Sequence, residues 1–241
     1  TSIQLGDPHV IAAALRCPVV SDFRRADIAA GGQGAPFAPA FHQALWQHDH
    51  PDSVIINIGG IANLSAWPQG KLLGFDTGPG NVLMDMWILA HQSLAFDQNG
   101  AWGRLGAIDT ALFEALKTDP YFNQTAPKST SRQYFNLAWL NRHLEGQPST
   151  IDVIDVQATL CALTAWSIAQ AVIGLDQTTA AVWVCGGGVH NHALMQRLAE
   201  YLPGVNIGST DQIGWSADAL EAGAFAWFAK LRMALHPVAL S

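Results

Sequence analysis

The sequence predicts an α/β protein, because short β-branched runs alternate with helical segments along its 241 residues. Two of these runs have the character of buried strands that end in consecutive glycines. Residues 53–58 lead into Gly59-Gly60, and residues 180–185 lead into three glycines that open a helix. Hydrophobic residues make up 49% of the chain, which is enough to bury a sizeable core in one large domain or two small ones.

The first fifty residues contain short elements around a polar, glycine-rich loop. Asp7 at an N-cap position and Pro8 in the first turn favour a helix over residues 9–14. The other elements that we expect here are strands at 3–5 and 18–20, a loop over 22–36, a helix at 38–47 and a linker at 48–52.

From Ser53 onward, strands and helices alternate more regularly. The expected strands lie at residues 53–58, 61–66, 71–75, 180–185 and 205–207. The expected helices lie at residues 82–90, 106–116, 137–144, 156–173, 191–200 and 217–235, and residues 127–133 are expected to be irregular.

The composition argues against several classes of function. The net charge is −7 and only 13% of residues are charged, so the basic patch of a nucleic-acid binder is not indicated. No uninterrupted apolar run reaches the ~18 residues of a membrane span, and no signal-peptide pattern opens the sequence. The three cysteines are scattered and form no CxxC pair, which favours a reducing compartment such as the cytoplasm.

The aromatic and histidine residues are expected to be structural or solvent-facing. Nine tryptophans, such as Trp46 and Trp87, stand at helical positions and are expected in a core or an interface. Nine histidines show no metal-site spacing. His42, His48 and His50 lie in or beside a helix end, and we expect them to face solvent.

Two glycine turns are candidates for ligand binding. Gly59 and Gly60 join two expected strands and allow backbone N–H groups to approach an anion, although the same pair is common in hairpins that bind nothing. Residues 186–188 follow a buried strand and lead into a helix at Asn191. Such a glycine segment can hold a nucleotide, or it can be a compact turn that binds nothing. Three successive glycines cost roughly 1 kcal/mol each in backbone entropy, and this favours a function.

A third candidate is the acidic residue Asp76, which stands at the end of an expected strand and before a loop that leads into a helix. Carboxyl ends of strands are where α/β sheets bind ligands. Asp76 is therefore a candidate general base or magnesium ligand, or else a cap of the following helix.

Six blocks, taken in order, resemble the anhydro-N-acetylmuramic acid kinase family of the actin-like ATPase class. They are DFR with Asp27 and AAGGQGAP within residues 22–36, NIGGIAN at 57–63, GFDTGPGN at 74–81, PKSTSR at 127–132, CGGG with Asn191 at 185–191, and DALEA with Phe225-Ala226-Trp227 at 218–227. In the fourth block Ser131 replaces the family's glycine. The resemblance covers essentially the whole chain.

The resemblance implies an α/β, actin-like (ribonuclease H-like) fold of two lobes. Residues 1–50 are then a remnant of the N-terminal lobe with a substrate loop, and residues 51–241 are the C-terminal lobe. The implied reaction converts ATP, water and 1,6-anhydro-N-acetylmuramic acid into the sugar 6-phosphate and ADP. Such enzymes serve cell-wall recycling in the cytoplasm, with Mg²⁺, as homodimers.

The resemblance also assigns roles to individual residues. Asp76 is the implied catalytic base and a candidate Mg²⁺ ligand. The implied ATP-binding residues are Gly59, Gly60, Asn63, Gly186, Gly187, Gly188, Asn191 and Glu221. The implied substrate-binding residues are Arg24, Asp27, Gln33 and Gly34; a surface ion pair between Arg24 and Asp27 is the structural alternative.

The family's first phosphate loop, GTSxDG, does not occur in residues 1–241. We therefore expect the sequence to start partway through a longer polypeptide, and we expect residues 1–241 to be inactive alone. Two other interpretations stay open: another sugar or acetate-type kinase of the actin-like class, and a catalytically inactive lobe that senses nucleotide or muropeptide.

Overall fold

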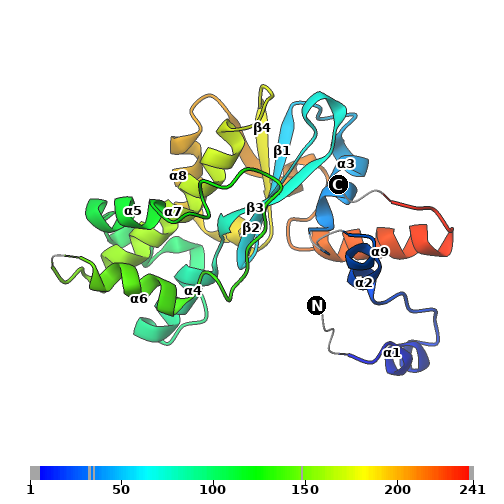
Figure 1. Ribbon diagram of the computed structural model, residues 1–241, viewed down its shortest axis with the longest axis horizontal. Helices are drawn as coiled ribbons and strands as arrows, with labels where there is room; N and C mark the ends of the chain where they lie inside the picture. The colour runs from blue at the N-terminus through cyan, green and yellow to red at the C-terminus, as the bar shows by residue number, and fades with distance from the viewer. Residues whose placement is uncertain (1–5, 32–33, 35, 148, 239–241) are drawn as a thin grey trace.

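A five-stranded mixed sheet lies at the centre of the computed structural model, which describes residues 6–31, 34, 36–147 and 149–238. The strand order is β3-β2-β1-β4-β5 (Figure 1). The strands are β1 (Ser53–Ile58), β2 (Ile61–Ala66), β3 (Leu73–Pro79), β4 (Ala181–Cys185) and β5 (Asn206–Ser209). β1 pairs antiparallel with β2 and parallel with β4. This sheet confirms the predicted α/β class.

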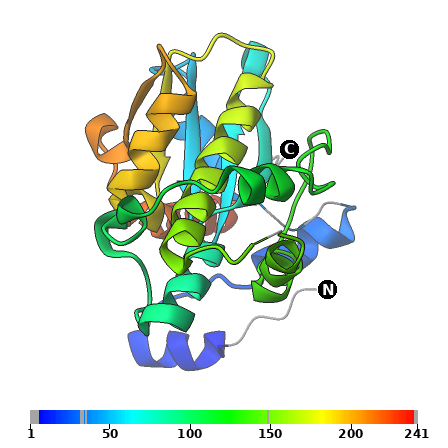
Figure 2. The same cartoon turned by 90° about the vertical axis from the view of Figure 1, so that its left-hand side faces the viewer.

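Helices cover both faces of the sheet. The helices are α1 (Pro8–Leu15), α2 (Phe23–Ala29), α3 (Ala38–Trp46), α4 (Val82–Gln92), α5 (Thr110–Lys117), α6 (Leu137–Glu145), α7 (Val153–Ile173), α8 (His192–Tyr201) and α9 (Leu220–Met233). The short 3₁₀ helices are η1 (Pro68–Gly70), η2 (Gln98–Gly100), η3 (Gly103–Leu105), η4 (Gly187–His190) and η5 (Thr210–Ile213). Figure 2 shows α7 and α8 across one face, with the strands behind them.

Side chains of β1 alternate between two hydrophobic clusters, as expected for a central strand. Val54, Ile56 and Ile58 belong to the larger cluster, which includes the buried side chains of α7 and α8. Ile55 belongs to the second cluster, with residues of α3 and α9. Helix α3 therefore shares its core with the sheet, although it precedes the predicted boundary at residues 50 and 51.

Helix α1 lies away from this core (Figure 1), and none of its residues is buried. By length and composition alone, α7 could cross a membrane, although polar residues interrupt its apolar stretches. However, 78% of its most apolar window is buried in the part of the chain that the structure describes, so α7 is a core helix here.

The N-terminal segment differs from its predicted secondary structure. Residues 18–20 form no strand and take no part in the sheet, so that prediction was wrong. The predicted loop over 22–36 contains helix α2, whose first turn is braced by an ion pair of 2.5 Å between Arg25 and Asp22. The predicted strand at 3–5 lies outside the described residues.

The third strand differs from its predicted bounds in a way that matters for the site. It was expected at 71–75 but runs from Leu73 to Pro79, because pairing with β2 continues past a bulge between Ala62 and Asn63. Asp76 therefore stands within β3, held by its ladder, and does not cap the following helix α4.

The turn after β4 requires glycine at two positions for different reasons. Gly186 has a φ of +77°, in the left-handed region that favours glycine, and a Cβ there would lie 2.9 Å from the Ile58 carbonyl oxygen. Gly188 is buried, and a Cβ there would collide with the side chain of Ile58. Gly187 between them is exposed, and a Cβ would meet only Asn81 Nδ2, at 3.7 Å.

This difference yields a stability prediction. Gly188→Ala should lower the free energy of unfolding by about 1–3 kcal/mol, because the added methyl group overpacks the contact with Ile58. Gly187→Ala is the matched control and should change it by less than about 0.5 kcal/mol. Urea unfolding of the two variants measures both values, and equal losses would contradict this description of the turn.

Candidate functional site

A row of four side chains crosses the sheet at the end where β1 and β4 terminate. The strand register places Asn57 opposite both Cys185 of β4 and Asn63 of β2, and it places Asn63 opposite Asp76 of β3. Directly opposite residues project from the same face of a sheet. All four line one cavity of about 370 Å³.

Further segments form the walls of this cavity. Arg24, Phe37 and His42 line it from the α2–α3 region, and Asp218 and Glu221 line it from the start of α9. The remaining lining includes Gly59, Gly186 and Gly187. The structure thus brings Asp76, Arg24 and several of the predicted nucleotide residues to one cavity from distant parts of the chain.

The PKSTSR segment holds Asp76 in place. The Thr130 N–H donates to Asp76 Oδ2 at 2.9 Å, and the Asp76 N–H donates to the Lys128 carbonyl at 3.0 Å. The Tyr121 hydroxyl donates to the Asp76 carbonyl at 2.6 Å. Burial raises the pKa of Asp76 to about 6, and the Thr130 N–H opposes that rise. The carboxylate therefore combines a fixed position with a pKa close to neutrality.

The Gly59-Gly60 turn is tied to the start of α4. Their carbonyl oxygens accept hydrogen bonds from the N–H groups of Gly80, Asn81 and Val82, at 2.8–3.1 Å. The Gly60 N–H belongs to the same planar peptide as the Gly59 carbonyl, so it points away from α4. Gly59 lines the cavity, whereas Gly60 is not among the lining residues.

Arg132 covers the outer side of this turn. Its guanidinium carbon would lie 2.7 Å from a Cβ built on Gly60, so any side chain at Gly60 would displace the end of the Arg132 side chain. Burial raises the pKa of Asp85 to about 6, and the positive charge of Arg132 opposes that rise. Arg132 belongs to the PKSTSR block, but no role for it was predicted, because the spacing of the blocks does not reveal that a strand turn lies beside it.

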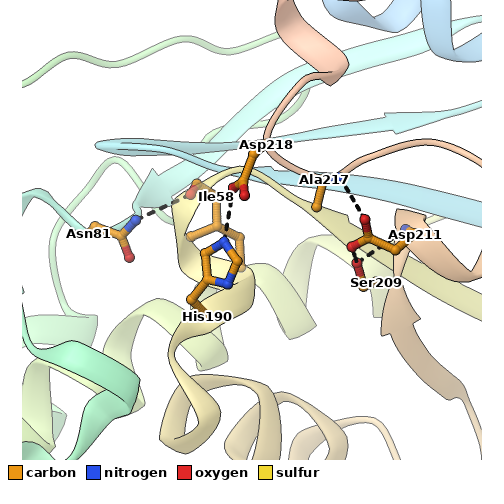
Figure 3. A network of polar contacts seen from close by, with 7 residues as sticks. All are labelled: Ile58, Asn81, His190, Ser209, Asp211, Ala217 and Asp218. Atoms are coloured by element: carbon orange, nitrogen blue, oxygen red, sulfur yellow. Dashed lines mark hydrogen bonds and ion pairs between the residues drawn. The ribbon is translucent and has the colours of Figure 1, made fainter.

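A second cavity of about 470 Å³ adjoins the first at Gly187, which lines both. Asn191 lines the second cavity and its Oδ1 caps α8 by accepting the Leu194 N–H at 3.1 Å. Figure 3 shows His190 of η4 pointing to Asp218, with Nε2 and Oδ1 2.9 Å apart. Gly188 lines neither cavity.

The predicted substrate residues Arg24, Asp27 and Gly34 form a clamp on the loop itself. Arg24 Nη1 donates to the Gly34 carbonyl at 2.6 Å, and Asp27 Oδ2 accepts the Gly34 N–H at 2.7 Å. The Arg24 guanidinium also stacks 5.3 Å from the centre of the Phe37 ring. Of the three, only Arg24 lines the cavity. Gln33 lies outside the described residues.

Two cavity residues were missed or misjudged from the sequence. His42 was expected to face solvent but is 2% exposed, because α3 packs its face that contains His42 and Trp46 against the sheet. The i, i+4 spacing of these two residues was the available signal. Asn57 was not given a role of its own, although a polar residue near the end of an apolar strand marks a site facing a ligand or a partner.

The family model for anhydro-N-acetylmuramic acid kinase matches residues 1–241. The protein of that name from Sulfurovum sp. (strain NBC37-1) is 49% identical over 233 residues, which are 96% of this chain and 63% of the relative. That from Pseudomonas syringae pv. tomato (strain ATCC BAA-871 / DC3000) is 48% identical over 229 residues, 95% of this chain and 63% of the relative. The chain thus spans about 63% of the length of these relatives.

Solved structures give weaker likenesses. The activator of the 2-hydroxyisocaproyl-CoA dehydratase from Clostridium difficile with bound ADPNP aligns with a TM-score of 0.48 and 15% identity, covering 83% of this chain and 66% of that one. Component A of the (R)-2-hydroxyglutaryl-CoA dehydratase from Acidaminococcus fermentans aligns with a TM-score of 0.42 and 18% identity, covering 78% and 65%. The assignment therefore depends on the sequence matches: the chain belongs to the anhydro-N-acetylmuramic acid kinase family.

Proposed function

We propose that the protein containing this chain is an ATP-dependent kinase that opens 1,6-anhydro-N-acetylmuramic acid and phosphorylates its O6. The observation that carries the proposal is the position of Asp76. Its carboxylate is fixed in the floor of a cavity that also holds Arg24 and the Gly59 and Gly186–Gly187 turns. We further propose that the enzyme acts in the cytoplasm, in cell-wall recycling, as a homodimer.

In this proposal, Asp76 is the general base for the ring-opening step. Its carboxylate accepts a proton from a water molecule whose oxygen bonds to C1 of the sugar, while the bond between C1 and O6 breaks and leaves O6 with the electron pair. O6 then attacks the γ-phosphorus of ATP, and ADP leaves. A pKa of about 6 keeps Asp76 largely ionised at pH 7 and yet basic enough to accept the proton.

The nucleotide is proposed to lie across the two cavities, with its phosphates beside Gly59 and its adenosine beside Gly187 and Asn191. Gly60, Asn63, Gly186, Gly188 and Glu221 were also assigned to the nucleotide from the resemblance. Among these, Gly188 acts through packing on Ile58, and Glu221 lies on the cavity wall. Burial raises the pKa of Cys185, and the charge of Glu221 adds to that rise. The phosphoryl step itself needs mainly positioning and neutralisation of charge.

The carboxylates of the cavity suit a Mg²⁺ ion that is bound together with the substrate phosphates, rather than a metal ion bound by protein side chains alone. Asp76, Asp218 and Glu221 line it, but the described residues contain no cluster of His, Cys, Asp or Glu that could hold a metal by itself. Mg²⁺ is usually bound by one or two carboxylates together with substrate phosphates. When bound, the ion would neutralise the phosphate charge, with Asp76 the candidate protein ligand.

The proposal is tested by supplying the full-length protein with ATP, Mg²⁺ and the anhydro-sugar, and identifying the products by mass spectrometry. We expect ADP and the 6-phosphate of N-acetylmuramic acid in equal amounts. ATP turnover with other sugars or with acetate, but not with the anhydro-sugar, would indicate a different kinase. Nucleotide binding without any turnover would indicate a sensing protein.

Asp76→Asn in the full-length protein should lower kcat by about 10²–10⁴-fold, because the amide keeps the shape of the side chain but accepts no proton. The affinity for ATP, measured by calorimetry, should change little. The same exchange at the exposed residue Asp52 serves as the control and should leave turnover unchanged. Turnover of Asp76→Asn within a few-fold of the parent would remove Asp76 from the role of base.

The same substitution should stabilise the fold at neutral pH. Because folding raises the pKa of Asp76 from 3.8 to about 6, the protonated form contributes stability that is fully present below pH 3.8 and lost as pH rises through 6. A shift of two units corresponds to about 3 kcal/mol at most. Thermal unfolding should therefore show Asp76→Asn above the parent at pH 8 and level with it at pH 3.5; a gap that persists at pH 3.5 would mean that burial of the charge is not the cause.

Gly187→Val should weaken nucleotide binding without unfolding the protein. The branched side chain would project into the open space where the two cavities meet, since nothing but Asn81 stands near its Cβ. Calorimetric titration with ATP measures the loss, and Gly187→Ala provides a smaller step at the same position. ATP affinity equal to that of the parent in both variants would place the nucleotide elsewhere.

A further inference from the structure

His42 is nearly sealed inside the protein and yet reaches the cavity. It is 2% exposed, and its ring lies 5.8 Å from that of Trp46 in the cluster between α3 and the sheet. His42 Nδ1 lies 2.9 Å from the hydroxyl oxygen of Ser65, a residue of β2 with no exposed surface. Since His42 also lines the cavity, its ring is fixed on one side and open on the other.

The second ring nitrogen of His42 is uncommitted. No described residue makes a hydrogen bond with Nε2. Nε2 is also not one of the fully buried atoms without a partner, so it retains some accessible surface. This nitrogen is therefore reached from the cavity. The hydrogen bond between Nδ1 and Ser65 decides which proton the ring carries, so Nε2 offers either a donor or an acceptor in a fixed place.

The His42 ring stays neutral across the physiological range, because burial lowers its pKa to about 3. A neutral imidazole supplies no charge to bind a carboxylate or a phosphate. It suits an uncharged polar group, such as a hydroxyl or an amide, whose hydrogen bonds a buried site must replace. The charged wall residues Arg24 and Glu221 lie on other segments of the same cavity.

Asn63 extends this neutral surface towards Asp76. It precedes Ser65 by two residues, so both project from the same face of β2, and its partner across the strands is Asp76. The amide oxygen of Asn63 is buried without a hydrogen-bond partner. No described hydrogen bond fixes this amide, so a ligand group can set its orientation. The resemblance assigned Asn63 to the nucleotide. In the structure, however, Asn63 lies on β2, the strand whose Ser65 contacts His42, and it stands opposite Asp76.

We propose that His42 and Asn63 form a subsite for the uncharged polar groups of the sugar, its hydroxyls or its acetamido group, beside Asp76. The subsite rests on the proposed function and deepens it. It would fix the orientation of the ring, so that C1 faces the water activated by Asp76. The chemistry separates this subsite from Arg24, whose charge suits the carboxylate of the same substrate.

The test measures sugar and nucleotide affinity separately in the full-length protein. His42→Phe keeps an aromatic ring for the cluster but removes both nitrogens, and Asn63→Leu removes the amide at nearly constant volume. Each should weaken binding of the anhydro-sugar by about 10–100-fold, the range for losing a hydrogen bond to a buried polar group. Each should leave ATP affinity within about two-fold, and His42→Gln should recover part of the sugar affinity.

The exposed residue His48 provides the matched control, and His48→Phe should alter neither affinity. Thermal unfolding identifies any variant that fails to fold. If His42→Phe fails to fold, the sugar affinity of Asn63→Leu tests the subsite. If the parent binds the sugar and both folded variants bind it as tightly as the parent does, the proposed subsite is overturned but the proposed function is not. Loss of ATP affinity in parallel also overturns it, and a parent that does not bind the sugar overturns the proposed function as well.

Discussion

The pairing of the central strand β1 on both of its edges is the constraint on which the site depends. Its register sets Asn57 opposite Asn63 on one side and Cys185 on the other, and β2 in turn sets Asn63 opposite Asp76. A slip of one residue would turn this row from the cavity face to the face that packs on α7. Because the glycine turns directly follow β1 and β4, the same register also sets their positions.

Electrostatics gives this site a second constraint. Asp76, Asp218 and Glu221 line the cavity, whereas Arg24 is the one arginine or lysine among its described lining residues. A polyphosphate placed there meets unfavourable charge unless positive charge accompanies it. In the proposed function a magnesium ion would supply that charge, and the guanidinium of Arg132 lies beside the turn. Beside these charges, the neutral wall at His42 suits the uncharged groups of the proposed sugar, whereas Arg24 suits its carboxylate.

Much of the fold was predictable because local signals and tertiary structure agree there. The β-branched run at 53–58 became β1 with the predicted bounds, and the strand expected at 180–185 became β4, Ala181–Cys185. Failures occurred where partners decide the outcome. Residues 18–20 have strand-like composition but take no part in the described sheet. Strand β3 extends to Pro79, beyond its expected end at residue 75, because β2 continues to pair with it.

The candidate site was predictable as a set of motifs but not as a geometry. Spacing and resemblance pointed to Asp76 and to the glycine turns, and the structure places Asp76, Gly59, Gly186 and Gly187 in one cavity. No sequence signal indicates that Gly188 faces Ile58, or that Asp27 bonds to the backbone of Gly34. The burial of His42 depends on how α3 docks on the sheet, which periodicity indicates only weakly.

The proposed chemistry makes one commitment that a simple kinase does not share: water must enter the sugar at C1 before phosphoryl transfer. The most direct measurement is to run the full-length protein with ATP and the anhydro-sugar in ¹⁸O-labelled water and to locate the label by mass spectrometry. The sugar phosphate, quenched quickly and corrected with authentic product incubated in parallel, should carry one labelled oxygen at C1 and none in its phosphate. Label in inorganic phosphate alone, or a sugar phosphate free of label, would contradict ring opening by water and with it the role of Asp76.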